Sequence, residues 1–212
     1  MGNNNDNSGG NNAGRSLLPY IIILVAILAV IFWAKSSYNG MVEQEETVKT
    51  AWSQVENQYQ RRLDLIPNLV STVKGYAAHE RETLEAVINA RAKASAVSID
   101  VSNLANLDAA ALQRFQASQG ELGSALSRLL AVSERYPELK ANEAFTTLQV
   151  QLEGTENRIA VERRRFNQTA QQYNTGIRKF PANILASLFG FGQRPYFTAE
   201  EGADSAPTVD FQ

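Results

Sequence analysis

LLPYIIILVAILAVIFWA, residues 17–34, is the stretch that decides the architecture of this 212-residue chain. It contains no charged side chain, and a helix of this length, rising ~1.5 Å per residue, spans about 27 Å, close to the ~30 Å hydrocarbon core of a bilayer. Arg15 and Lys35 bracket it, and Tyr20 and Trp33 lie near its ends, where amphipathic rings favour the headgroup region. The stretch therefore predicts a single transmembrane helix that binds membrane lipid through residues 17–34.

Two other interpretations of this stretch compete with a membrane span. A cleaved signal peptide usually has a shorter apolar region of ~7–15 residues, although Ala34-Lys35-Ser36 offers small residues at a cleavage-like spacing. A buried helix of a globular core rarely lacks every polar position. The span places the chain in the cell membrane as a single-pass protein. Its orientation is nearly balanced, because Arg15 precedes the stretch whereas Lys35 and Lys49 follow it, which leans toward a cytoplasmic body.

Beyond the span, apolar residues recur every three or four positions, which is the rhythm of amphipathic helices. No stretch alternates with a period of two, so we expect an all-α fold without a sheet. The first apolar stripe comprises Met41, Val48, Trp52, Val55, Tyr59 and Ile66. Two further helical faces comprise Leu69, Val73, Leu84, Val87 and Ile88, and then Leu112, Phe115, Leu122, Leu126, Leu129 and Tyr136. The last stripe comprises Phe145, Leu148, Leu152, Ile159, Phe166, Tyr173 and Phe180.

Helix-breaking and capping residues divide these stripes. Pro67 should end or kink the first helix, so residues 38–96 form either one kinked helix or two helices. Asp108 and Asn142 stand where N-caps are expected, after a linker at 97–108 and after a turn at Tyr136-Pro137 respectively. We therefore predict one N-terminal transmembrane helix followed by an antiparallel bundle of about four long helices, over residues 35–180.

The two ends of the chain differ from this body. Residues 1–16 are rich in Asn and Gly, and residues 198–212 are acidic without a basic side chain, so we expect both to be disordered tails. The net charge of −2 gives no basic excess, and we expect no nucleic-acid partner. The chain has no cysteine and a single histidine, His79, which excludes thiolate and multi-histidine metal sites within one chain.

Several runs of residues resemble the LemA family of bacterial membrane proteins. They are Tyr38-Asn39 with Val42, RRLDLIPNLVSTVKGYAAHE at 61–80, ERYPELKAN at 134–142, RFNQTAQQYN at 165–174, FPANILASLFGF at 180–191 and PYF at 195–197. The resemblance covers about residues 38–200. It implies an N-terminal membrane anchor, a helical bundle on the inner side and a short tail outside. It implies no established activity and no catalytic residues.

Four polar groups are candidates for chemistry, and each has a simpler structural explanation. His79-Glu80 begins like a zinc-peptidase motif, but Thr83 stands where the second histidine would be needed. Three carboxylates near the membrane, at positions 43, 45 and 46, form either a cation site or a solvated face. Arginines at 158 and 163–165 either bind anionic lipid or an acidic partner, or belong to a solvated surface, since successive residues fan around a helix. Residues 61–64, before Pro67, form either a docking notch or a structural element.

The apolar segment at residues 181–197 follows the bundle and is the best candidate interaction surface, through Ile184, Leu185, Leu188, Phe189 and Phe191. It either packs as a cap on the bundle or stays exposed to bind a protein, a second subunit or the bilayer surface. We expect a membrane-anchored interaction or scaffold protein, not an enzyme, with no cofactor. Its partner is an unknown protein, and assembly into a homo-oligomer is a further expectation. The alternative is a carboxylate-based metal-dependent enzyme or metal-binding bundle.

Overall fold

The computed structural model describes residues 13–101 and 107–198. Over these residues the secondary structure is helical without a strand, as predicted. The acidic tail predicted from residue 198 lies outside the described residues except for Thr198, and the predicted N-terminal tail lies outside them up to residue 12. The first helix begins at Ala13, within the segment predicted as a tail.

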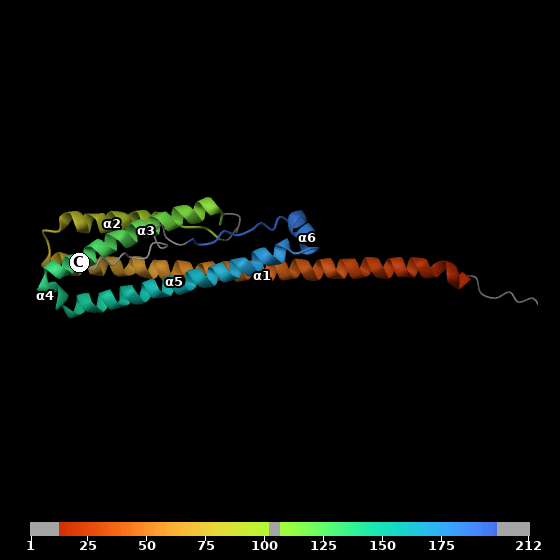
Figure 1. The fold of residues 1–212 in the computed structure, drawn as a ribbon, viewed down its shortest axis with the longest axis horizontal. Helices are drawn as coiled ribbons and strands as arrows, with labels where there is room; N and C mark the ends of the chain where they lie inside the picture. The colour runs from red at the N-terminus through yellow and green to blue at the C-terminus, as the bar shows by residue number, and fades with distance from the viewer. Residues whose placement is uncertain (1–12, 102–106, 199–212) are drawn as a thin grey trace, which may run out of the picture.

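Helix α1 (Ala13–Tyr76) contains both the apolar stretch and the first helix of the bundle without interruption. From Leu17 onward it is long and apolar enough to cross a membrane, and it is the one candidate span among the described residues. Figure 1 shows its N-terminal half projecting alone from one end of the bundle. The candidate membrane segment and the bundle therefore share one helix, with no linker between them.

Pro67 does not end α1, which continues for nine more residues before the turn at 77–80. Helix α2 (Arg81–Ala96) then runs back, so residues 38–96 belong to two helices. A proline at position 67 cannot donate to the carbonyl of Leu63, four residues earlier. The guanidinium Nε of Arg91, on α2, donates to that carbonyl at 3.0 Å. The neighbouring helix therefore satisfies the acceptor that the proline leaves without its usual backbone donor.

Helices α3 (Ala109–Val132) and α5 (Glu143–Arg178) complete an antiparallel four-helix arrangement with α1 and α2 (Figure 1). The predicted N-caps are confirmed. The Asp108 carboxylate accepts from the backbone N–H of Ala111 at 2.6 Å, and the Asn142 side chain accepts from the backbone N–H of Phe145 at 2.9 Å. Between α3 and α5 the chain forms a 3-10 turn (Ser133–Arg135) and the short helix α4 (Pro137–Lys140). Helix α6 (Ala182–Phe189) follows α5.

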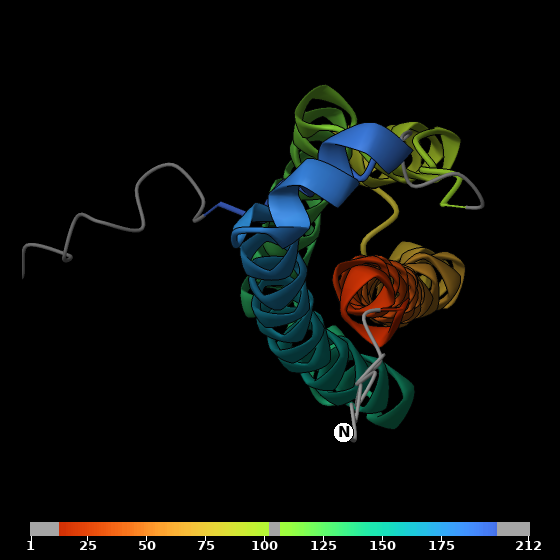
Figure 2. The ribbon, with the colours of Figure 1, turned by 90° about the vertical axis from the view of Figure 1, so that its right-hand side faces the viewer.

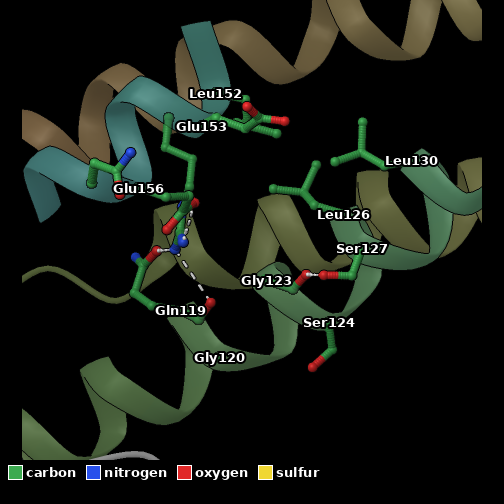
Figure 3. Close-up of a pocket in the computed structure, with 12 residues that line it drawn as sticks. Gln119, Gly120, Gly123, Ser124, Leu126, Ser127, Leu130, Leu152, Glu153 and Glu156 are labelled. Atoms are coloured by element: carbon green, nitrogen blue, oxygen red, sulfur yellow. Dashed lines mark hydrogen bonds and ion pairs between the residues drawn. The ribbon is translucent and has the colours of Figure 1, made fainter. Parts of the chain in front are cut away.

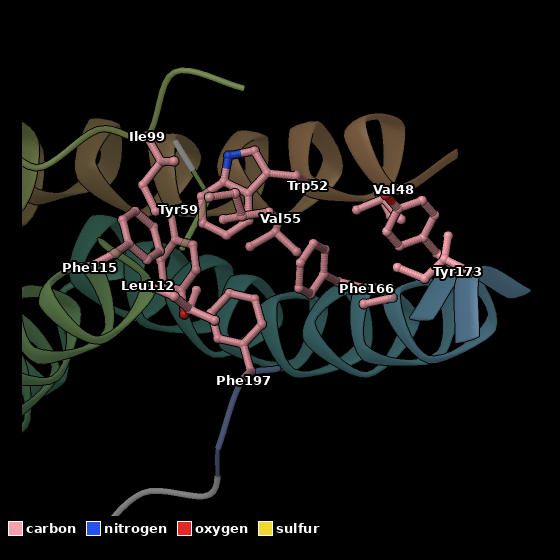
Figure 4. Packing of buried hydrophobic residues seen from close by; sticks show 14 of the residues in the cluster. Val48, Trp52, Val55, Tyr59, Ile99, Leu112, Phe115, Phe166, Tyr173 and Phe197 are labelled. Carbon is pink, nitrogen blue, oxygen red and sulfur yellow. The ribbon is translucent and has the colours of Figure 1, made fainter. Parts of the chain in front are cut away.

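The core divides into two clusters along the bundle, and most of the predicted stripe residues lie in them. The proximal cluster, nearer the candidate span, is aromatic (Figure 4) and includes Met41, Val48, Trp52, Val55, Tyr59, Leu112, Phe115, Phe166, Tyr173 and Phe197. The distal cluster includes Leu63, Ile66, Leu69, Val73, Leu84, Val87, Leu122, Leu126, Leu129, Leu139, Phe145 and Leu152. Two stripe predictions are wrong. Ile88 is exposed because it lies on the outer face of α2, and Phe180 is exposed because α5 ends before it.

Candidate interaction surfaces

An extended segment after α6, residues 191–198, lies back along the bundle and is here called the strap. Two asparagines of α5 hold it. The side chain of Asn174 donates to the carbonyl of Arg194 and accepts from its N–H, both at 2.8 Å. Asn167 does the same with Phe197, at 2.9 and 2.8 Å. Each amide thus pairs with one strap residue as a neighbouring strand would, which fixes the strap in one register.

The strap contributes two side chains to the proximal end of the bundle. Phe197 lies parallel to the Trp52 ring at 5.9 Å and edge-on to Phe166 at 5.5 Å. Arg194 is 8% exposed, and its guanidinium lies 3.0 Å from the carboxylate of Glu45 and 5.6 Å from the centroid of the Tyr173 ring. Burial raises the pKa of Tyr173, and the charge of Arg194 opposes that rise. The strap therefore closes the proximal cluster with an aromatic ring and a paired charge.

The predicted surface on the apolar segment divides into two faces. Leu185 and Phe191 pack against the proximal cluster, together with the buried Ala186. Ile184, Leu188 and Phe189 are 58%, 73% and 55% exposed. One side of α6 therefore packs as a cap, and its other side is an exposed apolar surface, for which binding stays a prediction.

An open groove of about 570 Å³ lies between α3 and α5 (Figure 3). Its α3 wall carries four small residues beside Gln119, Leu126 and Leu130, and its α5 wall carries two carboxylates. The lining includes Gly120, Gly123, Ser124 and Ser127 on the first wall, and Glu153 and Glu156 on the second. A Cβ atom added at either glycine would meet nothing within 4 Å. The groove is therefore wide at its α3 wall, and another backbone can approach closely there.

Arg62 lies at one end of this groove and is only 4% exposed. Its guanidinium donates to the Glu156 carboxylate at 2.9 Å, to the backbone carbonyl of Gln119 at 3.2 Å and to the side-chain carbonyl of Gln119. The same group lies 5.0 Å from the centroid of the Tyr59 ring. Arg62 thus links α1, α3 and α5. Arg62 is therefore a structural element at this point, since a buried charge needs such partners.

The remaining polar candidates do not converge on one point. Glu45 pairs with the strap, whereas Glu46 pairs with Lys49 on its own helix. His79 lies exposed in the turn between α1 and α2, off any helix. Arg163 donates to the Thr198 carbonyl at 2.9 Å. Over residues 13–101 and 107–198 there is no group of three or more His, Cys, Asp or Glu side chains that could hold a metal ion.

Sequence reasoning missed the two asparagines, and it did not predict the burial of Arg62 or the contact that Arg91 makes. A signal for the asparagines was present. Phe166-Asn167 and Tyr173-Asn174 repeat an aromatic–asparagine pair seven residues apart, beside the buried stripe of α5. A short polar side chain next to each buried ring indicates that something other than an apolar helix covers that face. No comparable signal marks Arg62 or Arg91, because arginines at helical spacing usually lie on a solvated face.

Comparisons with known proteins place this architecture in a family. The LemA family model matches residues 51–211. The magnetosome protein MamQ of Magnetospirillum gryphiswaldense is 28% identical over 206 residues, which cover 91% of this chain and 76% of that protein. MamQ 2 of Paramagnetospirillum magneticum is also 28% identical, over 87% of this chain and 73% of that protein. Protein LemA of Metamycoplasma hominis is 21% identical, over 86% of this chain and 77% of that protein. Because the family model matches most of the chain, from the middle of α1 through the strap, this protein belongs to the LemA family.

Proposed function

We propose that this protein is a membrane-anchored scaffold that holds its bundle at a fixed position above the bilayer and binds a helix of a partner protein there. Residues 17–34 are the anchor, in contact with membrane lipid. The α3–α5 groove is the binding surface. The protein does no chemistry on its partner and uses no cofactor.

The observation that carries this proposal is the continuity of α1 from the candidate span into both core clusters. A flexible linker would let the bundle move freely relative to the membrane. A single packed helix instead fixes its height, and the part of α1 beyond Lys35 reaches roughly 60 Å at ~1.5 Å per residue. Surfaces along the bundle therefore stand at defined distances from the bilayer, which suits the binding of partners that are themselves in the membrane.

The chemistry of the groove favours a helical partner with small and basic side chains. Gly120 and Gly123 leave space for close approach of a backbone, as small residues do at tightly packed helix pairs. Glu156 is paired with Arg62, and the exposed Glu153, which accepts from the side chain of Gln149 at 3.1 Å, adds a second carboxylate to the groove lining. A basic side chain on the partner would pair with that carboxylate and fix its register.

Site-specific crosslinking in the native membrane tests the binding surface. A photoreactive amino acid at Ser124, in the groove, should give an adduct of one defined mass. The same residue at Val150, which is 62% exposed on α5 outside the groove, should not. Gly123→Trp places a large ring at the groove, where a Cβ atom meets nothing within 4 Å, and should abolish the Ser124 adduct. An adduct of twice the chain mass would identify the partner as a second copy. Equal adducts at Ser124 and Val150, or none, would contradict the proposal.

We further propose that the bundle lies on the cytoplasmic side. The support is the slight excess of basic residues after the span, Lys35 and Lys49, over Arg15 before it. Because the chain has no cysteine, a single Glu138→Cys variant at the far end of the bundle reports sidedness directly. A membrane-impermeant maleimide should label it only after the cells are opened. Labelling of intact cells would place the bundle outside.

A further inference from the structure

Helix α6 lies across the end of the bundle that faces the candidate span. Figure 2 views the molecule from the side of the span, with α1 seen end-on, and α6 extends across the view in front of the bundle. Tyr38 of α1 contacts the rings of Phe189 and Phe191 edge-on, at 5.0 and 5.6 Å between centroids. The helix is therefore fixed at this end, with its axis roughly across that of α1.

The height of α6 above the anchor follows from these contacts. Tyr38 comes four residues after Ala34, the last residue of the uncharged stretch. At ~1.5 Å per residue that places Tyr38 about 6 Å beyond the apolar segment, which is within the headgroup layer of about 5–7 Å on each side of the hydrocarbon core. If residues 17–34 span a bilayer, α6 is at the level of its headgroups.

The outer face of α6 is apolar. Ile184 and Leu188 lie four residues apart on α6, so they share one face of the helix, and both are exposed. Phe180, in the turn just before α6, is 81% exposed. Phe189 adds a ring that is more than half exposed. The opposite face already packs on the bundle through Ala182, Leu185 and Ala186. A helix with two apolar faces needs a second apolar environment, since water disfavours such a continuous patch.

Basic residues lie just before this patch in the chain and just before Tyr38 on α1. Lys35 on α1 and Arg178 and Lys179 at the end of α5 are all exposed. Basic residues at this level are attracted to an anionic bilayer surface. An apolar stripe with basic residues beside it is the pattern of a helix that lies in the membrane interface.

We propose that α6 is a second membrane contact, with Phe180, Ile184, Leu188 and Phe189 inserted at the boundary between headgroups and acyl chains. The occupant of this surface is the lipid bilayer in which α1 is anchored. Two contacts, one through the span and one through α6, would fix the tilt and rotation of the bundle as well as its height. This inference rests on residues 17–34 spanning the bilayer and is independent of the partner in the α3–α5 groove.

The test uses the full chain in liposomes of phosphatidylcholine and phosphatidylglycerol, with a nitroxide on a single cysteine at position 188. Oxygen concentrates in the acyl region, whereas a polar nickel chelate stays in water. Leu188→Cys should therefore show an oxygen-to-nickel accessibility ratio several-fold higher than Val150→Cys. Val150 is a matched control because it is similarly exposed, 62% against 73%, and lies near the start of α5, at the opposite end of that helix from α6.

A second variant separates the bilayer from a protein contact. Ile184→Asp, in the Leu188→Cys background, places a charge on the outer stripe while the inner face of α6 stays unchanged. Nickel accessibility at position 188 should then rise several-fold, with the helix content by circular dichroism retained. The inference is overturned if the label at 188 is as open to nickel as the label at 150. Protection from both oxygen and nickel would also overturn it, because that result indicates a second copy on the patch.

Discussion

We expect Arg91 to stabilise the protein because it supplies the hydrogen-bond donor that Pro67 lacks. The guanidinium Nε of Arg91 donates to the Leu63 carbonyl at 3.0 Å, in place of the N–H that Pro67 lacks. Leu63 is buried and Arg91 is half-buried, so water replaces this donor poorly. A hydrogen bond to a charged group contributes about 1.5–3 kcal/mol. Arg91→Met keeps most of the apolar stem and should lower the free energy of unfolding by about 2 kcal/mol.

The effects of substitutions at positions 91 and 67 on the free energy of unfolding should be coupled. Pro67→Ala restores the backbone donor to Leu63, and alanine is about 3 kcal/mol better than proline in a helix interior. In that background the Leu63 carbonyl keeps a partner when Arg91 is removed. Arg91→Met should then lower the free energy of unfolding by only about 0.5 kcal/mol, the difference expected from side-chain packing and not from an unsatisfied acceptor.

A double-mutant cycle measures this coupling. The free energy of unfolding of the four proteins would be obtained from urea titrations of the full chain in mild detergent, followed by circular dichroism. The coupling energy should be about 1–2 kcal/mol, which exceeds the usual non-additivity of independent sites. Arg91→Lys offers a matched control, since an ammonium group keeps the charge and a donor. If Arg91→Met lowers stability equally with proline and with alanine at 67, the proposed role of Arg91 is wrong.

Three further predictions concern the bundle. Asn174→Ala removes both bonds to Arg194, so the strap should loosen, Trp52 fluorescence should shift to the red, and the free energy of unfolding should fall by about 1–3 kcal/mol. Phe197→Ala removes the ring stacked on Trp52 and should destabilise the protein by about 3 kcal/mol in urea titrations, with unchanged helix content. Burial raises the pKa of Glu56 above its ordinary value of 4.5, so folding favours the protonated carboxyl. The stability of the bundle should therefore fall as the pH rises above 4.5 and this carboxyl loses its proton. Glu56→Gln should therefore stabilise the protein at neutral pH, and the difference should vanish below pH 4.5 in a series of melting curves.

The parts of the fold that sequence predicted are those set by local spacing. Val48, Trp52, Val55 and Tyr59 are spaced by three and four, so a helix places them on one face, and all four are buried. The caps at Asp108 and Asn142 were predictable for the same reason, because a cap acts on a donor only three residues away. Both partners of such an interaction lie within a few residues of each other in the sequence, so the sequence alone predicts it.

Interactions between distant segments were not predictable in this way. Pro67 signals a break in α1, but its effect is cancelled by Arg91 on another helix, and no local rule connects these positions. The apolar segment at residues 181–197 posed a different difficulty. Ile184 and Leu185 are adjacent and equally apolar, yet one is exposed and the other packs on the bundle. Hydrophobic periodicity assigns a direction only when the opposite face is polar, and α6 is apolar on both.

The lengths of the helices explain why the strap exists. Helix α5 has 36 residues, whereas α2 has only 16 and α3 has 24. α1 and α5 therefore extend beyond the reach of a full four-helix cross-section at the end nearer the candidate span, where their aromatic faces would be open to water. Residues 191–198 cover that face with Phe197, and Asn167 and Asn174 supply the hydrogen bonds that an extended backbone needs in place of a helix. The unequal helix lengths and the aromatic–asparagine repeat thus have one cause: the proximal half of the bundle is completed by an extended segment instead of a fourth helix.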